Sequence, residues 1–109
     1  MLGEFFRAIN DFNRSIEIAP YNFQAFNKRG IVYMDMGEFG SAIVDFNQAI
    51  ELYAEYAAAY YQRSLAHTAL GNREAAEDDR TKALELDPEV EEEYLKWEKI
   101  RAARRETTS

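Results

Sequence analysis

The residues that could perform acid–base or metal chemistry in this 109-residue chain are few and poorly grouped. His67 is the only histidine, and the chain has no cysteine, which excludes thiolate nucleophiles and thiolate metal ligands. A lone histidine without a neighbouring serine, cysteine or carboxylate motif forms no catalytic pair. We therefore expect His67 to be a packed structural residue, and we predict no catalytic residue, no bound metal and no cofactor.

Two acidic runs and one tryptophan are the other candidates for a site. The runs are Glu77-Asp78-Asp79 and Glu91-Glu92-Glu93. Both have a helical pattern, and consecutive residues on a helix point in different directions, so they cannot converge on one ion. We predict solvated helix faces there. Trp97 could bind a ligand, but its helical spacing from Tyr94 favours a place in the core.

The elements that carry these residues repeat with a constant period of about 34 residues, a length typical of repeats that are built from pairs of helices. Gly3, Gly37 and Gly71 are one period apart. The same offset aligns Ala8, Ala42 and Ala76; Asp11, Asp45 and Asp79; and Ile16, Ile50 and Leu84. Within a period, apolar residues recur every three to four positions, as in an amphipathic helix. A glycine between two such runs suits a left-handed C-cap. Each period is therefore predicted to be a pair of antiparallel helices, and stacked pairs bury one continuous core.

A helix pair with this period resembles the tetratricopeptide repeat family, whose pattern is Trp-x2-Leu-Gly-x2-Tyr, then Ala-x3-Phe, then Pro. Residues 23–56 carry this pattern at Phe26, Arg29, Gly30, Tyr33, Ala42, Phe46 and Ala49. Residues 57–90 carry it at Tyr60, Arg63, Ser64, His67, Ala76, Arg80, Ala83 and Pro88. The resemblance covers about residues 1–90. It implies an all-α, right-handed α-solenoid of antiparallel helix pairs with a C-terminal capping helix.

Two arginines depart from the family pattern in the same way. Arg29 and Arg63 replace the usual leucine, and each precedes an aspartate, Asp45 or Asp79, by the same interval. Because the same substitution appears twice with the same acid, we predict that each pair forms an ion pair within its own hairpin.

The repeat divides the chain, as a single domain over residues 1–109, into five parts. Residues 1–22 are predicted to be the second helix of a truncated repeat, with Met1-Leu2 as the tail of its missing partner. Residues 23–56 and 57–90 are complete repeats, 91–105 a capping helix and 106–109 a frayed tail. In the cap, Val90, Tyr94, Trp97 and Ile100 share one predicted face.

The truncated repeat leaves an apolar stripe with one side uncovered. Phe5, Ile9, Phe12 and Ile16 form this stripe at helical spacing. Soluble monomers avoid such patches. Two explanations stand: the chain is a fragment of a longer array, or the stripe pairs with another copy. We expect both together, with a homodimer formed through the first helix.

Composition narrows the class of partner. A formal charge of −7 and a pI near 4.7 argue against nucleic acid. The acidic balance serves either solubility or a preference for basic peptides.

No stretch approaches the length of a membrane span, and the N-terminus lacks a signal-peptide pattern. We therefore expect a soluble, cytoplasmic chain without membrane insertion.

The resemblance implies a non-catalytic protein–protein interaction module that holds a peptide or helix in a concave groove. By alignment, the groove-facing residues are Gln24, Asn27, Ile31, Met34, Asp35, Ala58, Tyr61, Leu65, Thr68, Ala69, Glu92, Leu95 and Lys99. Tyr61 is the expected anchor. The places that clamp an acidic chaperone tail in some family members hold Lys28, Ala58 and Gln62, which argues against that ligand. The alternative function is a structural module that self-associates through its first helix.

Overall fold

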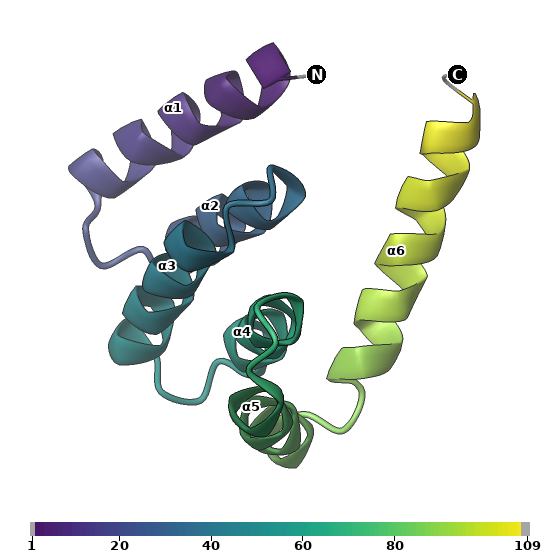
Figure 1. Cartoon of the computed structure of the whole chain (residues 1–109). Coiled ribbons are helices and arrows are strands. Elements are labelled where there is room, and N and C mark those ends of the chain that lie inside the picture. Colours follow the sequence, from purple (N-terminus) through teal and green to yellow (C-terminus); the bar gives the residue numbers. More distant parts are fainter. Residues whose placement is uncertain (1, 108–109) are drawn as a thin grey trace.

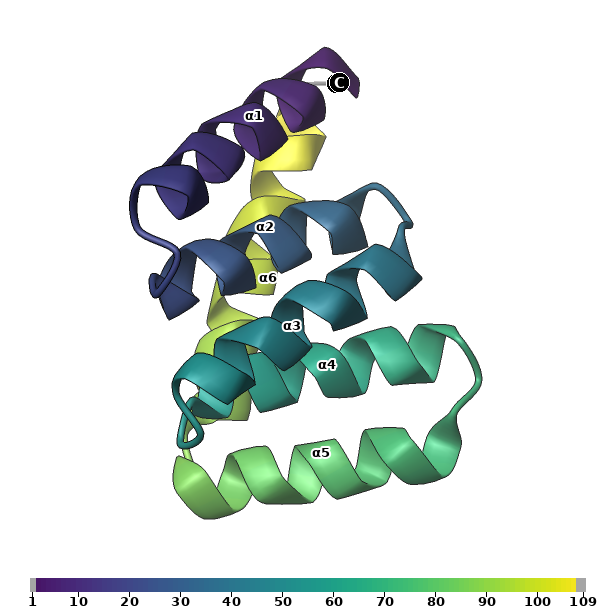
Figure 2. The same ribbon diagram turned by 90° about the vertical axis from the view of Figure 1, so that its left-hand side faces the viewer.

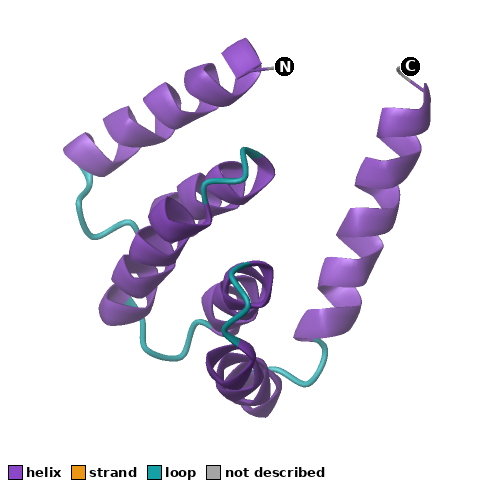
Figure 3. Ribbon diagram, viewed as in Figure 1, coloured by secondary structure: helices purple, strands orange, loops and turns teal. Residues whose placement is uncertain are grey.

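The structure is a computed structural model that describes the backbone of residues 2–107 and the side chains of residues 2–104. Six α-helices follow one another, and no strand occurs within residues 2–107 (Figures 1 and 3). They are α1 (Leu2–Ile18), α2 (Phe23–Asp35), α3 (Phe39–Leu52), α4 (Ala57–Ala69), α5 (Arg73–Leu86) and α6 (Val90–Thr107). The all-α architecture of stacked helix pairs predicted from the repeat period is confirmed.

Glycine turns close the two complete hairpins, α2–α3 and α4–α5. Gly37 and Gly71 have φ angles of 79° and 81°, a left-handed conformation that favours glycine. The amide following each glycine donates back to the preceding helix, from Glu38 to Tyr33 and from Asn72 to His67, each at 2.8 Å. These bonds satisfy carbonyls at the helix end. The predicted glycine C-caps are confirmed at both turns.

The core lies where the two helices of a hairpin approach most closely. Ala42, Phe46 and Ala49 of α3 are fully buried, at 0% exposure. Gly30 of α2 faces Phe46 so tightly that an added Cβ would lie 2.5 Å from the ring. The repeat places one small residue, Gly30 or Ser64, in the first helix of each hairpin, and this residue lets the second helix approach closely.

Helix α1 packs against α2 as an unpaired second helix (Figure 2). None of its side chains is buried, and Phe5, Ile9, Phe12 and Ile16 are all partly exposed. The expectation that Leu2 belongs to a missing first helix is wrong, since α1 begins at Leu2 and includes Gly3. Met1 lies outside the described residues. Gly3 lies within a helix, so it matches Gly37 in sequence register but not in conformation.

Helix α6 takes a path that the repeat does not predict. It leaves α5, contacts α4 and α5 near its own start, and runs past α4 toward the level of α1 (Figures 1 and 2). Only Val90 of its predicted apolar face is buried. Trp97 is 63% exposed and Ile100 45%, so the predicted core place of Trp97 is wrong. The helix also continues to Thr107, which corrects the tail expected at 106–109.

Candidate functional site

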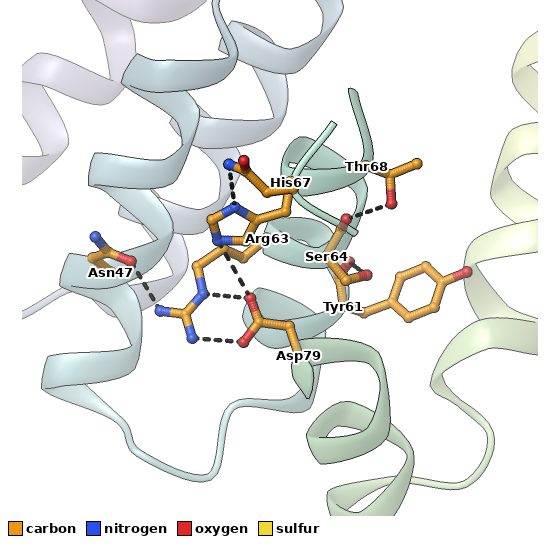
Figure 4. Close-up of polar contacts among 8 residues, drawn as sticks. Asn47, Tyr61, Arg63, Ser64, His67, Thr68 and Asp79 are labelled. Atoms are coloured by element: carbon orange, nitrogen blue, oxygen red, sulfur yellow. Dashed lines mark hydrogen bonds and ion pairs between the residues drawn. The ribbon is translucent and has the colours of Figure 1, made fainter. Parts of the chain in front are cut away.

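The two predicted arginine–aspartate pairs form, each within its own hairpin. Arg29 Nε and Nη2 donate to the two carboxylate oxygens of Asp45 at 2.8 and 2.7 Å. Arg63 makes the same bidentate contact with Asp79, at 2.7 Å for both bonds (Figure 4). In each case the hydrogen bond to the aspartate raises the pKa of the guanidinium above its ordinary value. The paired charge form is therefore favoured in both hairpins.

Each arginine also reaches the second helix of the preceding repeat. Arg29 Nη1 donates to Asn13 Oδ1 at 2.8 Å, and Arg63 Nη1 donates to Asn47 Oδ1 at 2.9 Å (Figure 4). Asn13 and Asn47 are one period apart. A single guanidinium thus joins three helices, and this contact links one repeat to the next. The two asparagines were not predicted, although their spacing of one full period was a usable signal.

His67 has a structural environment. Its side chain is partly buried, with Nδ1 3.4 Å from Asn72 Nδ2 and Nε2 3.8 Å from Asp79 (Figure 4). The Asp79 carboxylate already accepts hydrogen bonds from Arg63, so its role is to stabilise the α4–α5 hairpin. Within the described residues, no group of three His, Cys, Asp or Glu side chains could hold a metal ion.

A groove of about 540 Å³ lies between α6 and the first helices α2 and α4. Its walls combine aromatic and aliphatic side chains with charged and amide groups. The lining residues are Asn27, Lys28, Ile31, Asp35, Ala58, Tyr61, Gln62, Val90, Glu93, Tyr94, Trp97, Glu98 and Arg101. Because this surface is concave and combines large apolar side chains with polar groups, it has the character of a ligand site.

One end of the groove is closed by contacts at the start of α6. The Tyr61 hydroxyl donates to Glu91 Oε2 at 3.1 Å, and Arg80 binds both Glu91 oxygens at 2.8 and 2.9 Å. The Tyr61 and Tyr94 rings are 5.2 Å apart between centroids. Burial, reinforced by the nearby Glu91 carboxylate, raises the pKa of Tyr61 to about 12. Hydrogen bonding to Arg80 lowers the pKa of Glu91. Tyr61 is therefore a neutral donor at physiological pH.

A second contact bridges the other end of the groove. Arg101 of α6 donates to Asp35 of α2 at 2.5 Å and lies 3.5 Å from Glu98 on its own helix. Asp35 and Arg101 are 66 residues apart in sequence. The hydrogen bond to Asp35 raises the pKa of Arg101. The α6 helix is thus tied to the solenoid near both ends of the groove.

Only some of the residues expected in the groove line it. Asn27, Ile31, Asp35, Ala58 and Tyr61 do, all of them on α2 and α4. The other residues expected on α2 and α4 do not line the groove; they are Gln24, Met34, Leu65, Thr68 and Ala69. None of the three residues expected on α6 lines it either; they are Glu92, Leu95 and Lys99. The alignment treats α6 as a stacked first helix, whereas its actual path turns the face with Tyr94 and Trp97 toward the groove.

The aromatic and polar groups that the groove offers differ from those expected. Tyr61, the expected anchor, is only 5% exposed because α6 covers it, whereas Trp97 is 63% exposed. Asn27 is 5% exposed, and its Oδ1 has no hydrogen-bond partner among the described residues. A buried acceptor without a donor is costly, so this oxygen gains from any rearrangement that lets the donor of a ligand reach it.

These features define a class of protein: an α-solenoid of helical hairpins with a concave groove. Family models described as tetratricopeptide repeat match residues 23–56 and 57–90. The chain belongs to the tetratricopeptide repeat family, as its residue pattern predicts. No curated protein sequence matches the chain. In the described part, no helix is long and apolar enough to cross a membrane.

Solved structures share this fold. The first tetratricopeptide domain of Spaghetti (RPAP3), bound to the HSP90 peptide SRMEEVD, is 31% identical, with a TM-score of 0.77 and 93% of this chain and 82% of that chain covered. MamA is 31% identical, with a TM-score of 0.75 over 82% of this chain. The chain spans about half, 52%, of that MamA chain. The TPR2B domain of yeast Sti1, in complex with a pHsp70, shares the fold at 24% identity, a TM-score of 0.76 and coverage of 83% and 72%.

Proposed function

We propose that this chain is a non-catalytic protein-interaction module that binds a peptide or helix of a partner protein in the groove between α2, α4 and α6. The observation that carries the proposal is the groove itself, whose lining includes the largely exposed Trp97 and Asn27, the residue with the unpartnered acceptor. An aromatic ring supplies contact area at low entropy cost, and a buried amide can bind the backbone of an extended peptide.

The charged residues of the groove indicate how much charge its ligand should carry. Asp35 is paired with Arg101, which also lies 3.5 Å from Glu98. Lys28 and Glu93, one basic and one acidic, are the remaining charged lining residues. A nearly balanced wall favours an amphipathic segment rather than a strongly charged tail. The RPAP3 relative has an acidic HSP90 peptide bound. Here the clamp places hold Lys28, Ala58 and Gln62, so we expect the SRMEEVD peptide to bind weakly or not at all.

The test is a peptide-display selection on the immobilised full chain, followed by calorimetric titration of each recovered peptide. Replacing Trp97 by alanine should weaken binding about tenfold or more, because a central aromatic anchor is lost. Leu95→Ala is the matched control, since Leu95 is also largely exposed on α6 but does not line the groove. The proposal fails if no peptide is recovered, or if the two variants bind every recovered peptide equally well.

Self-association through α1 remains a prediction of the sequence. Phe6 and Leu2 on this helix are 56% and 58% exposed, and they add apolar surface to Phe5 and Ile9. Sedimentation velocity at high micromolar concentration tests it, and a clean monomer would reject the homodimer.

A further inference from the structure

The Asp11 carboxylate of α1 stands where two equivalent carboxylates each bind an arginine. Asp45 and Asp79, one and two periods later, are both buried and both held by a bidentate guanidinium. Asp11 is exposed. Among residues 2–104, no side chain forms a hydrogen bond or ion pair with it. The arginine that would complete the pattern belongs to the helix that would pair with α1.

The residues around Asp11 match the same buried surface. We name Ala8, Asp11, Phe12 and Ser15 the open face of α1. The equivalent residues of α3 are all buried; they are Ala42, Asp45, Phe46 and Ala49. On the open face, three side chains are partly exposed and Asp11 is exposed. The open face thus keeps the chemistry of a hairpin interface that lacks its covering helix.

The α2–α3 interface shows what such a surface accepts. Arg29 supplies the guanidinium, and Gly30 next to it leaves room for the Phe46 ring, 2.5 Å from where a Cβ would stand. In the α4–α5 hairpin, Arg63 is again followed by a small residue, the buried Ser64. In both hairpins an arginine followed by a small residue therefore faces an aspartate, and in α3 that aspartate is followed by Phe46, as Asp11 is followed by Phe12 in α1.

We propose that the open face of α1 binds a partner helix with the pattern aromatic-x2-Arg-small, whose arginine pairs with Asp11 and whose small residue receives Phe12. This surface lies on α1, separate from the groove residues of α2, α4 and α6. The proposal therefore stands or falls independently of the proposed function.

A second copy of the chain does not supply this helix. Arg29 and Arg63 already bind their own aspartates. Helix α6 has Trp97 and Glu98 at the equivalent places, one period after Arg63 and Ser64. A two-fold contact between two α1 helices uses the same patch on both copies and offers Asp11 only Arg7 or Arg14. Neither arginine has the aromatic residue three positions earlier that Arg29 and Arg63 have, since Glu4 and Asp11 stand there. The helix therefore comes from a different polypeptide segment.

The direct test is the titration of the full chain with a synthetic peptide of residues 21–38, held helical by a staple joining positions 24 and 28. Both side chains are exposed in α2 and lie away from Arg29 and Gly30. The unmodified sequence should bind the chain. The peptide variants Arg29→Ala and Gly30→Val should each bind about tenfold more weakly, from the lost charge pair and from collision with Phe12.

Changes in the chain separate this contact from general attraction. Asp11→Asn should weaken the peptide about as much as Arg29→Ala does, whereas Asp78→Asn, an exposed acid on α5, should not. The pair Asp11→Arg with peptide Arg29→Asp should recover part of the binding. Equal affinity of all peptides, or no effect of Asp11→Asn, would overturn the proposal. So would a chain dimer that buries α1 and excludes the peptide.

A covalent version removes dependence on peptide affinity. A copy of residues 23–36 is placed directly before Gly3, the register it occupies before Gly37. Thermal unfolding of this extended chain should occur at least about 4 °C higher than that of the original chain. Adding Arg29→Ala within the copy should abolish most of the gain. An extended chain that unfolds at the original temperature overturns the proposal, whatever the peptide shows.

Discussion

At the scale of single residues, an arginine at a usual leucine position changes how a hairpin is held together. Arg29 brings a charge into the interface, and the 2%-exposed Asp45 neutralises it through two short bonds. Such a pair contributes less than its Coulomb attraction suggests, because both groups lose hydration. Losing one partner is more costly, since the other charge stays in place without compensation.

Asp45→Asn should therefore lower the free energy of unfolding by about 2–4 kcal/mol, measured by urea denaturation. Asp11→Asn is the matched control, in the same register but without a partner, and should change stability by less than about 0.5 kcal/mol. Equal losses in the two variants would show that the bidentate contact contributes nothing specific.

At the scale of the helices, the close approach of α2 and α3 requires glycine at position 30 but not at position 40. Gly30 and Gly40 both lie within helices, in α2 and α3. A Cβ on Gly30 would collide with Phe46, whereas a Cβ on Gly40 would meet nothing within 4 Å. Alanine favours a helix over glycine by roughly 0.8–1 kcal/mol when there is room for it.

The two glycines should therefore respond in opposite directions to replacement by alanine. Gly30→Ala should destabilise the chain by about 1–3 kcal/mol, through overpacking against Phe46. Gly40→Ala should stabilise it by roughly 0.5–1 kcal/mol. Thermal unfolding followed by circular dichroism checks both signs. A stabilising Gly30→Ala would mean that the Phe46 ring moves aside without cost.

At the scale of the whole molecule, α6 closes a groove that the stacked hairpins leave open. It is joined to α4 and α5 near its start, and Arg101 ties it to α2 farther along. One exposed ion pair is worth little free energy, so the distal half of α6 should open more readily than the hairpins.

Removing this tie should free the far half of α6 without unfolding the solenoid. In Arg101→Gln, we expect amide hydrogen exchange to speed up in residues 98–104 and to stay unchanged in α3. Lys99→Gln is the control, because Lys99 is exposed on the same helix and does not line the groove. Equal exchange in both variants would show that the Asp35 contact does not hold α6.

The sequence alone predicts the hairpins well because the period repeats their chemistry. Arg29–Asp45 and Arg63–Asp79 are found from spacing, since two copies of one substitution point to one contact. The path of α6 is not found, because it occurs once and no second copy shows its neighbours. In the turn before α4, the rings of Tyr53 and Tyr56 lie 4.9 and 5.0 Å from the Phe23 ring and 5.8 Å from each other, measured between centroids. The turn before α6 has Asp87, Pro88 and Glu89 instead.

The exposure of Trp97 has a practical consequence. Trp97 is the only tryptophan in the sequence, and the other aromatic residues are seven Tyr and seven Phe. Excitation near the red edge of indole absorption therefore selects one ring at the wall of the groove. Its emission maximum should lie at long wavelength while water surrounds it and should shift to the blue when an apolar segment covers it. The chain thus carries a built-in optical probe, and occupancy can be followed without any attached dye.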